Sequence, residues 1–214
     1  MNEGLFWSWM AILFLGAFHG INPGMGWLFA VALGMQERSQ RAVWRAMFPL
    51  ALGHALAIGA AIVLAAIAGT VIPIESLRWP VGLILLGLGG YRLFRHRHPR
   101  WGGMRVGMKG LTVWSFLMAS AHGAGLMVLP IFLGMTASAS AHGATCHGTA
   151  TFEGPMAGIA ATLVHGAGYL AVTALAAWIV YEKLGLGLLR KAWLNLDLVW
   201  ALALLATGGL TLVL

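Results

Sequence analysis

The chain has 214 residues, of which 60% are hydrophobic and only 9% are charged. An ordinary soluble domain has about a quarter of its residues charged, so this composition excludes a soluble enzyme. Apolar stretches of the length that crosses a bilayer, about 20 residues, recur along the whole sequence. They are apolar at both odd and even positions, which is typical of helices and excludes a transmembrane β-barrel.

In chain order, these stretches predict an all-α polytopic membrane protein with six transmembrane helices. The predicted spans cover residues 6–33, 47–71, 80–94, 110–134, 156–181 and 194–214. No basic residue precedes the first stretch, unlike a cleaved signal peptide, so we expect the first helix to be retained. The single cysteine, Cys146, excludes an intrachain disulfide.

The basic residues are distributed unevenly between the predicted loops. Twelve of the 13 Lys and Arg residues fall on one side of the six-helix arrangement, and only Arg78 falls on the other. Short loops rich in Lys and Arg stay in the cytoplasm, so the pattern predicts a multi-pass protein of a bacterial-type inner membrane with both termini periplasmic. The net charge of +7 then reflects retention beside the lipid bilayer and not binding of nucleic acid.

The two halves of the sequence resemble each other. FLGAFHG around His19 is similar to FLMASAHG around His122, and the segments around His54 and His165 also align. Each half has three predicted spans, an odd number, so the second half would be inverted relative to the first. We expect one integral membrane domain made of two inverted three-helix repeats, residues 1–100 and 101–214.

The four histidines in register are almost the only ionisable groups within the predicted spans. An ionisable group inside a membrane is costly and is a functional-site candidate by default. Neutral imidazole also binds transition metals and titrates near physiological pH. His19, His54, His122 and His165 could therefore form a set of ligands or a proton relay, while the alternative is core histidines bonded to backbone carbonyls.

The sharpest local feature is HGINPGMGW, which starts at His19. Pro23 removes a backbone donor and disfavours helical geometry at Asn22, so we expect the first helix to be broken at Pro23. Asn22, Met25 and the freed carbonyls could then line a polar cavity with His19. The alternative is a proline kink packed against a neighbouring helix.

A second, weaker group of candidate ligands lies in the predicted loop after the fourth span. His142, Cys146 and His147 have a spacing that could hold a soft metal ion. No second cysteine completes a zinc pattern. The alternative is a solvated loop with no ligand.

The segment at His19, Gly20, Pro23 and Gly24 resembles the His-Gly-x-x-Pro-Gly type motif of nickel/cobalt efflux and permease proteins in the lysine-exporter (LysE) transporter superfamily. The resemblance implies a metal-transport function, with His19 as a ligand. Relatives in the efflux branch tend to have an acidic residue in place of Asn22 and a histidine in place of Met25. The site here would therefore be uncharged, which suits a softer or monovalent cation better.

The favoured function is a secondary transporter that moves a transition-metal ion, nickel or cobalt by resemblance or a softer ion such as copper, by alternating access. The alternatives are export of a small organic solute, a non-transporting assembly or scaffold subunit, and a haem-binding redox protein. We expect no permanent cofactor and no enzyme activity, because neither paired carboxylates nor a nucleophile motif appears. A homo-oligomer or a larger membrane complex is compatible with the sequence. The candidate metal ligands are His19, Asn22, Met25, His54, His122 and His165.

Overall fold

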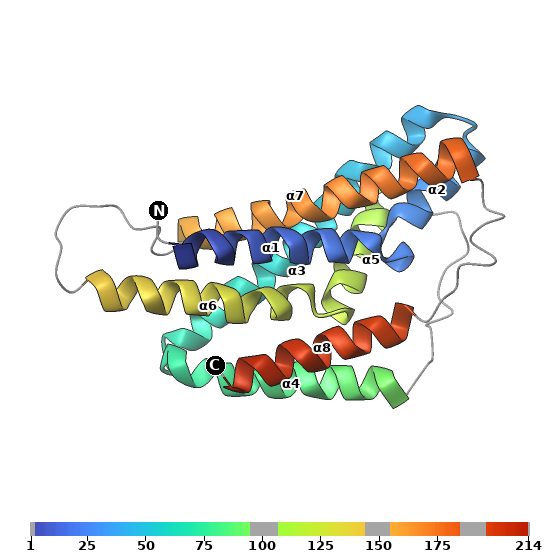
Figure 1. The fold of residues 1–214 in the computed structure, drawn as a ribbon. Coiled ribbons are helices and arrows are strands. Elements are labelled where there is room, and N and C mark those ends of the chain that lie inside the picture. The colour runs from blue at the N-terminus through green and yellow to red at the C-terminus, as the bar shows by residue number, and fades with distance from the viewer. Residues whose placement is uncertain (1–2, 95–106, 144–154, 185–195, 214) are drawn as a thin grey trace.

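A computed structural model of the protein describes residues 3–94, 107–143, 155–184 and 196–213, and no strand occurs among them (Figure 1). The helices are α1 (Glu3–Ile21), α2 (Trp27–Gln36), α3 (Gln40–Gly69), α4 (Ile74–Phe94), α5 (Met108–Ala121), α6 (Ala124–Gly143), α7 (Pro155–Ile179) and α8 (Leu196–Val213). A 3-10 turn, η1 (Pro23–Met25), joins α1 to α2, and a π-helical turn, η2 (Val180–Leu184), continues α7. The all-helical class expected from the sequence is confirmed for the described residues.

Several of these helices are long and apolar enough to cross a membrane. α1, α3 and the segment Met156–Lys183 each meet that length and composition. α5 and α6, bent by 60° at the junction between them, would make a fourth span if they cross together. α2 and the apolar part of α8 are shorter. The described helices therefore give three or four candidate spans, against the six that the sequence predicts.

The side chains are distributed as in a membrane protein. Large apolar side chains face outward from the long helices, including Phe14 and Leu64, each 67% exposed, and Leu163 at 65%. The buried set includes polar groups, among them four histidines. A soluble protein rarely exposes so much contiguous apolar surface, so this pattern is compatible with helices that face lipid.

The first predicted span is broken at the expected place. α1 ends at Ile21, and Asn22 has an extended backbone that begins η1. Gly26, with φ of 145°, then starts α2, and a side chain at this position would be strained and would collide with Leu50. Both the proline and this glycine therefore contribute to the break.

Side chains from other helices satisfy the carbonyls that this break exposes. The Tyr169 hydroxyl donates to the Met25 carbonyl at 2.7 Å, and the Trp114 indole donates to the Gly24 carbonyl at 3.2 Å. The Trp27 indole donates to the Ile21 carbonyl at 3.0 Å. The interrupted backbone is thus held in place by hydrogen bonds from protein side chains.

A second break separates α5 from α6. His122 caps the C-terminal end of α5, and Gly123 has a φ of 72°, in the left-handed region that glycine tolerates. Both interruptions thus follow shortly after a histidine that the sequence repeat aligns, namely His19 or His122.

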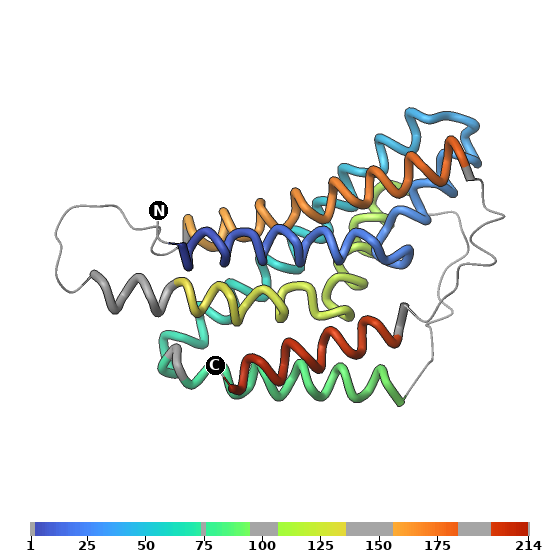
Figure 2. The backbone as a smooth tube through the Cα atoms, in the orientation of Figure 1, coloured from blue at the N-terminus to red at the C-terminus, as the bar shows by residue number. Residues whose placement is uncertain are grey.

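Glycines let the helices of the two halves approach closely. α1 packs along α7, α3 along α5, and α4 along α8 (Figures 1 and 2). A Cβ at Gly16 would overlap the backbone carbonyl of His165, and one at Gly53 would overlap that of Thr112. Such small-residue contacts drive helix association in membranes. Each of these three pairs therefore joins a helix of residues 1–100 to a helix of residues 101–214.

Candidate functional site

Three buried histidines from three helices meet between α1, α3 and α7. His19, His54 and His165 each have 0% exposed surface. Their ring centroids are separated by 5.0 Å (His19–His165), 5.4 Å (His54–His165) and 5.7 Å (His19–His54). We call these three residues the histidine trio.

The glycines around the trio explain why its rings can meet. Gly16 and Gly20 flank His19 on α1 and face the backbone of α7 at His165 and Tyr169. This close approach places the end of α1 against the middle of α7. A side chain at either glycine would push the two helices apart, so the trio depends on them.

The ring nitrogens of the trio make few hydrogen bonds. Nδ1 of His19 lies 2.7 Å from the carbonyl oxygen of Leu15, whereas Nε2 is buried with no partner. Both ring nitrogens of His54 and both of His165 are also buried without a partner. The Ile12 carbonyl lies near the His165 ring, but it makes no hydrogen bond to either nitrogen.

Five buried nitrogens without partners are unusual in one place. Leaving a buried donor or acceptor unsatisfied costs about 1–3 kcal/mol, and most such groups in proteins are paired. Each unsatisfied group therefore needs an explanation, such as a functional role or an ion or water that binds there. The trio therefore has the chemical character of a ligand set.

Two aromatic residues enclose the trio. The Tyr169 ring stacks on His54 with centroids 3.9 Å apart and planes 6° apart. The Trp200 ring contacts His19 at 4.7 Å and Phe18 at 4.5 Å. Tyr169 and Trp200 are themselves buried, so the trio has an aromatic shell as well as apolar surroundings.

The fourth predicted histidine, His122, does not contact the trio directly but contacts Trp200, which contacts His19. His122 is 3% exposed, and its ring lies 5.4 Å from that of Trp200. Its Nδ1 lies 2.7 Å from the Met118 carbonyl oxygen. The structure thus brings three of the four aligned histidines into direct ring contact and places His122 on the tryptophan that touches His19.

Asn22 and Met25, the other predicted ligands in the break, occupy buried positions with structural contacts. The Asn22 Oδ1 accepts a hydrogen bond from the Gly24 amide at 2.9 Å and so caps η1. Met25 is 1% exposed and belongs to an apolar cluster that includes Ile12 and Tyr169. The contacts described here therefore give both residues a part in holding the break.

The predicted loop ligands cannot be placed. Cys146 and His147 lie outside the described residues, and only the backbone of His142, in the last turn of α6, is described. Among the described residues, no group of three His, Cys, Asp or Glu side chains is already arranged around a metal position. Any metal site in this part of the chain would therefore require side-chain movement on binding.

The spacing of the trio is nevertheless compatible with a shared ion. Imidazoles that bind one tetrahedral metal ion through nitrogens at about 2 Å have ring centroids about 5 Å apart. The observed separations of 5.0 to 5.7 Å are close to this value. Rotation of the His54 and His165 rings would break no hydrogen bond, because their nitrogens make none.

Sequence reasoning missed Tyr169, Thr173 and Trp200. Tyr169 and Thr173 follow His165 at intervals of four residues on α7, a spacing that places all three on one helix face. Each of the three missed residues, Tyr169, Thr173 and Trp200, is fully buried. The helical spacing from His165 was a usable signal for the first two, whereas the position of Trp200 depends on how α8 packs.

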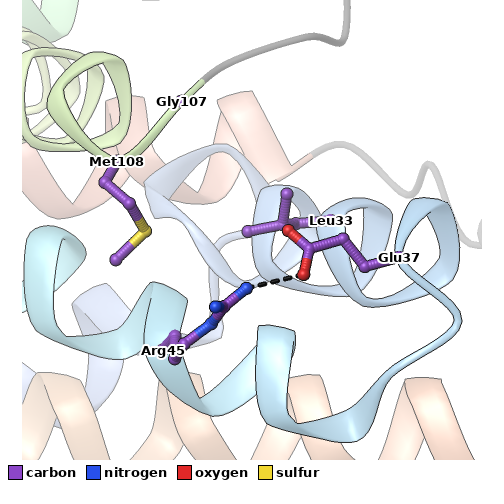
Figure 3. Close-up of a pocket in the computed structure, with 5 residues that line it drawn as sticks. All are labelled: Leu33, Glu37, Arg45, Gly107 and Met108. Carbon is purple, nitrogen blue, oxygen red and sulfur yellow. Dashed lines mark hydrogen bonds and ion pairs between the residues drawn. The ribbon is translucent and has the colours of Figure 1, made fainter.

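The pocket shown in Figure 3 lies away from the trio. It is lined by Leu33, Glu37, Arg45, Gly107 and Met108. An ion pair of 2.6 Å joins Arg45 to Glu37, with both side chains substantially exposed. Exposed pairs of this kind contribute about 0–1 kcal/mol, and this one connects the end of α2 to α3.

Comparisons with protein-family models, curated proteins and solved structures give no match to this chain.

Proposed function

We propose that the protein is a secondary transporter that moves a transition-metal cation across a membrane, with the histidine trio as its binding site. The observation that carries the proposal is the set of five buried trio nitrogens without hydrogen-bond partners. A metal ion would bind the lone pairs of these rings, and imidazole is a common ligand for such ions.

The hydrogen bond of His19 supports the choice of ligand atom. Histidines that bind metals through one nitrogen usually donate the other N–H to a carbonyl or carboxylate, which fixes the tautomer. The Leu15 carbonyl lies 2.7 Å from Nδ1 of His19, an arrangement in which Nδ1 carries the proton. Nε2 is then the free acceptor, and it is the atom without a partner.

The position of the trio favours transport over storage. Its members come from α1, α3 and α7, which belong to both halves of the sequence. α1 ends shortly after His19 in a broken segment. Interrupted helices beside a midplane site at a repeat interface are a common transporter design.

The packing is compatible with six spans arranged as two inverted repeats. α1 of the first half packs against α7 of the second half. In the predicted repeat α5 and α6 correspond to α1 and α2, and α7 corresponds to α3. The equivalent contact with the halves exchanged is that of α3 with α5 and α6, and it is also present. The first turn of α1 and the last turn of α8 lie at the same end of the bundle (Figure 1). With the positive-inside rule, we propose a bacterial-type inner-membrane protein with periplasmic termini.

The resemblance to nickel/cobalt efflux and permease proteins rests on His19, Gly20, Pro23 and Gly24, and it adds support to the same function. His19 lies in the trio and Pro23 in the adjacent break. Under this proposal the family motif supplies both a ligand and the interruption beside it.

Metal uptake into proteoliposomes would test the proposal. The purified protein is reconstituted, and uptake of Ni²⁺, Co²⁺, Zn²⁺ and Ag⁺, the last as a redox-stable substitute for Cu⁺, is compared with that of His19→Gln, His54→Gln and His165→Gln variants. We expect uptake of one of these ions that each trio substitution lowers at least tenfold. The control is His98→Gln, which lies in the Arg-rich stretch RHRHPR at residues 95–100, between the third and fourth predicted spans, and this variant should transport normally.

Two results would contradict the proposal. Uptake that is unchanged in all three trio variants would remove the trio from the transport path. A haem absorption band in the purified protein that disappears with the trio substitutions would instead favour the redox alternative. Gel filtration in detergent shows whether each variant remains folded.

A further inference from the structure

We infer that the trio selects a monovalent, soft cation of the Cu⁺ class in preference to a divalent ion such as Ni²⁺, Co²⁺ or Zn²⁺. This inference rests on the proposed function in taking the trio as the cation site. It concerns the charge and softness of the ion, which three features of the described residues indicate.

The first feature is the lack of negative charge near the trio in the described part of the chain. The three acidic side chains with described surroundings, Glu3, Glu37 and Glu182, are all exposed. The cost of taking an ion out of water rises with the square of its charge, so among the neutral groups described around the trio a divalent ion is penalised more than a monovalent one.

The second feature is the number and type of ligands. The trio offers three neutral nitrogen atoms, one from each ring, and its residues are fully buried. Ni²⁺ and Co²⁺ commonly take five or six ligands, several of them oxygen or water, and Zn²⁺ held by three imidazoles takes a water or substrate as its fourth ligand. A monovalent d¹⁰ ion is satisfied by two or three nitrogen ligands and needs no anion to complete its shell.

The third feature is the aromatic shell. Tyr169 presents its ring face to His54 at 3.9 Å, while its hydroxyl donates to the Met25 carbonyl. The phenol oxygen is therefore committed to a hydrogen bond and does not act as a hard anionic ligand. The Trp200 ring, with its centroid 4.7 Å from that of His19, adds a second aromatic group beside the trio.

The test is binding of single ions to detergent-purified full-length protein carrying Cys146→Ser, which removes the only thiol. Ag⁺ replaces Cu⁺ because it does not change oxidation state under these conditions. Isothermal titration with Ag⁺, Ni²⁺, Co²⁺ and Zn²⁺ gives an affinity for each ion. Matched titrations use His19→Gln, His54→Gln and His165→Gln, with His98→Gln as the control.

We expect one Ag⁺ to bind at least 100-fold more tightly than any divalent ion, and each trio substitution to weaken Ag⁺ binding at least tenfold while His98→Gln does not. X-ray absorption at the silver edge should show nitrogen neighbours. A sulfur-dominated silver shell, which would point to methionine ligands such as Met25, would overturn the assignment to the trio.

The inference and the proposed function fail in different ways. Divalent binding that is as tight as Ag⁺ binding and depends on the trio would overturn the selectivity and leave the proposed function standing. Failure of all four ions to bind in a trio-dependent way would overturn both. Each variant is judged only after it elutes as a single species in gel filtration.

Discussion

His19 and His122 make the same local hydrogen bond in two different helices. In each, Nδ1 lies 2.7 Å from the carbonyl oxygen four residues earlier, Leu15 for His19 and Met118 for His122. Each histidine also lies at the end of a helix, directly before a break. The bond restricts the orientation of both rings relative to their own helices.

The unsatisfied nitrogens of the trio lead to a prediction about stability. Replacing His54 with Leu removes two buried polar atoms without partners and supplies an apolar side chain of similar size. We expect the metal-free variant to be as stable as the parent or more stable, by up to about 1–3 kcal/mol, and to lose ion binding. Residues that are needed for function often lower the stability of the protein in this way.

Thermal unfolding of the metal-free proteins in detergent measures this effect. His54→Leu should unfold at the parent temperature or above it. Leu50→Ala, at a fully buried apolar position one turn earlier on α3, is the comparison and should be destabilised by about 2–5 kcal/mol. A His54→Leu variant destabilised as strongly as Leu50→Ala would show that His54 has a structural role.

A matched pair of glycines on α7 tests the close packing of α1 and α7. A Cβ at Gly168 would overlap the carbonyl oxygen of Leu13, whereas a Cβ at Gly166 meets nothing within 4 Å. We expect Gly168→Ala to separate the two helices and lower both stability and trio-dependent ion binding. Gly166→Ala should be neutral or stabilising by about 0.5–1 kcal/mol, because alanine favours the helix.

Unfolding temperature and ion affinity, measured on both glycine variants, check this prediction. Equal effects at the two positions would mean that the α1–α7 contact does not determine the geometry of the trio.

Tyr169 holds the break of the first span, and its hydroxyl can be removed separately from its ring. Tyr169→Phe deletes the hydrogen bond to the Met25 carbonyl and leaves a buried acceptor without a partner, at a cost of about 1–3 kcal/mol. The ring that stacks on His54 remains, so ion affinity should change by less than about tenfold. Tyr169→Leu removes both contacts and should lower stability and affinity together.

Thermal unfolding and titration of the two Tyr169 variants separate the roles of hydroxyl and ring. If Tyr169→Phe loses ion binding as completely as Tyr169→Leu, the phenol oxygen takes part in the site, and the inference of a nitrogen-only ligand set would be wrong.

The sequence predicts some parts of the site better than others. The break at Pro23 follows from local chemistry. The alignment of the two halves picks out four histidines, but it does not show that His19, His54 and His165 meet, because that depends on how α1, α3 and α7 pack. The roles of Asn22 and Tyr169 depend on which group satisfies each freed carbonyl or amide, and one sequence does not contain that information. Trp200 separates His122 from direct contact with His19 only because of how α8 packs.

One face of α7 indicates how an ion reaches the trio. Positions four residues apart on this face are all buried: Ala157 and Ala161 before His165, and Tyr169 and Thr173 after it. This face is apolar before the trio, at Ala157 and Ala161, and polar directly after it, at Tyr169 and Thr173, until the buried Ala177. The Thr173 Oγ1 is buried without a hydrogen-bond partner. A cation that must keep polar contacts would enter from the end of α7.

Labelling of single cysteines tests this direction of entry. In the Cys146→Ser background, Thr173→Cys should react with a membrane-impermeant thiol reagent from the side of the basic loops, and ions that bind the trio should slow the reaction. Ala161→Cys, on the same face beyond the trio, is the control and should stay unreactive from that side. Reaction of Ala161→Cys from the opposite side, with Thr173→Cys sealed, would contradict the prediction, because the apolar half of the face would then be the open one.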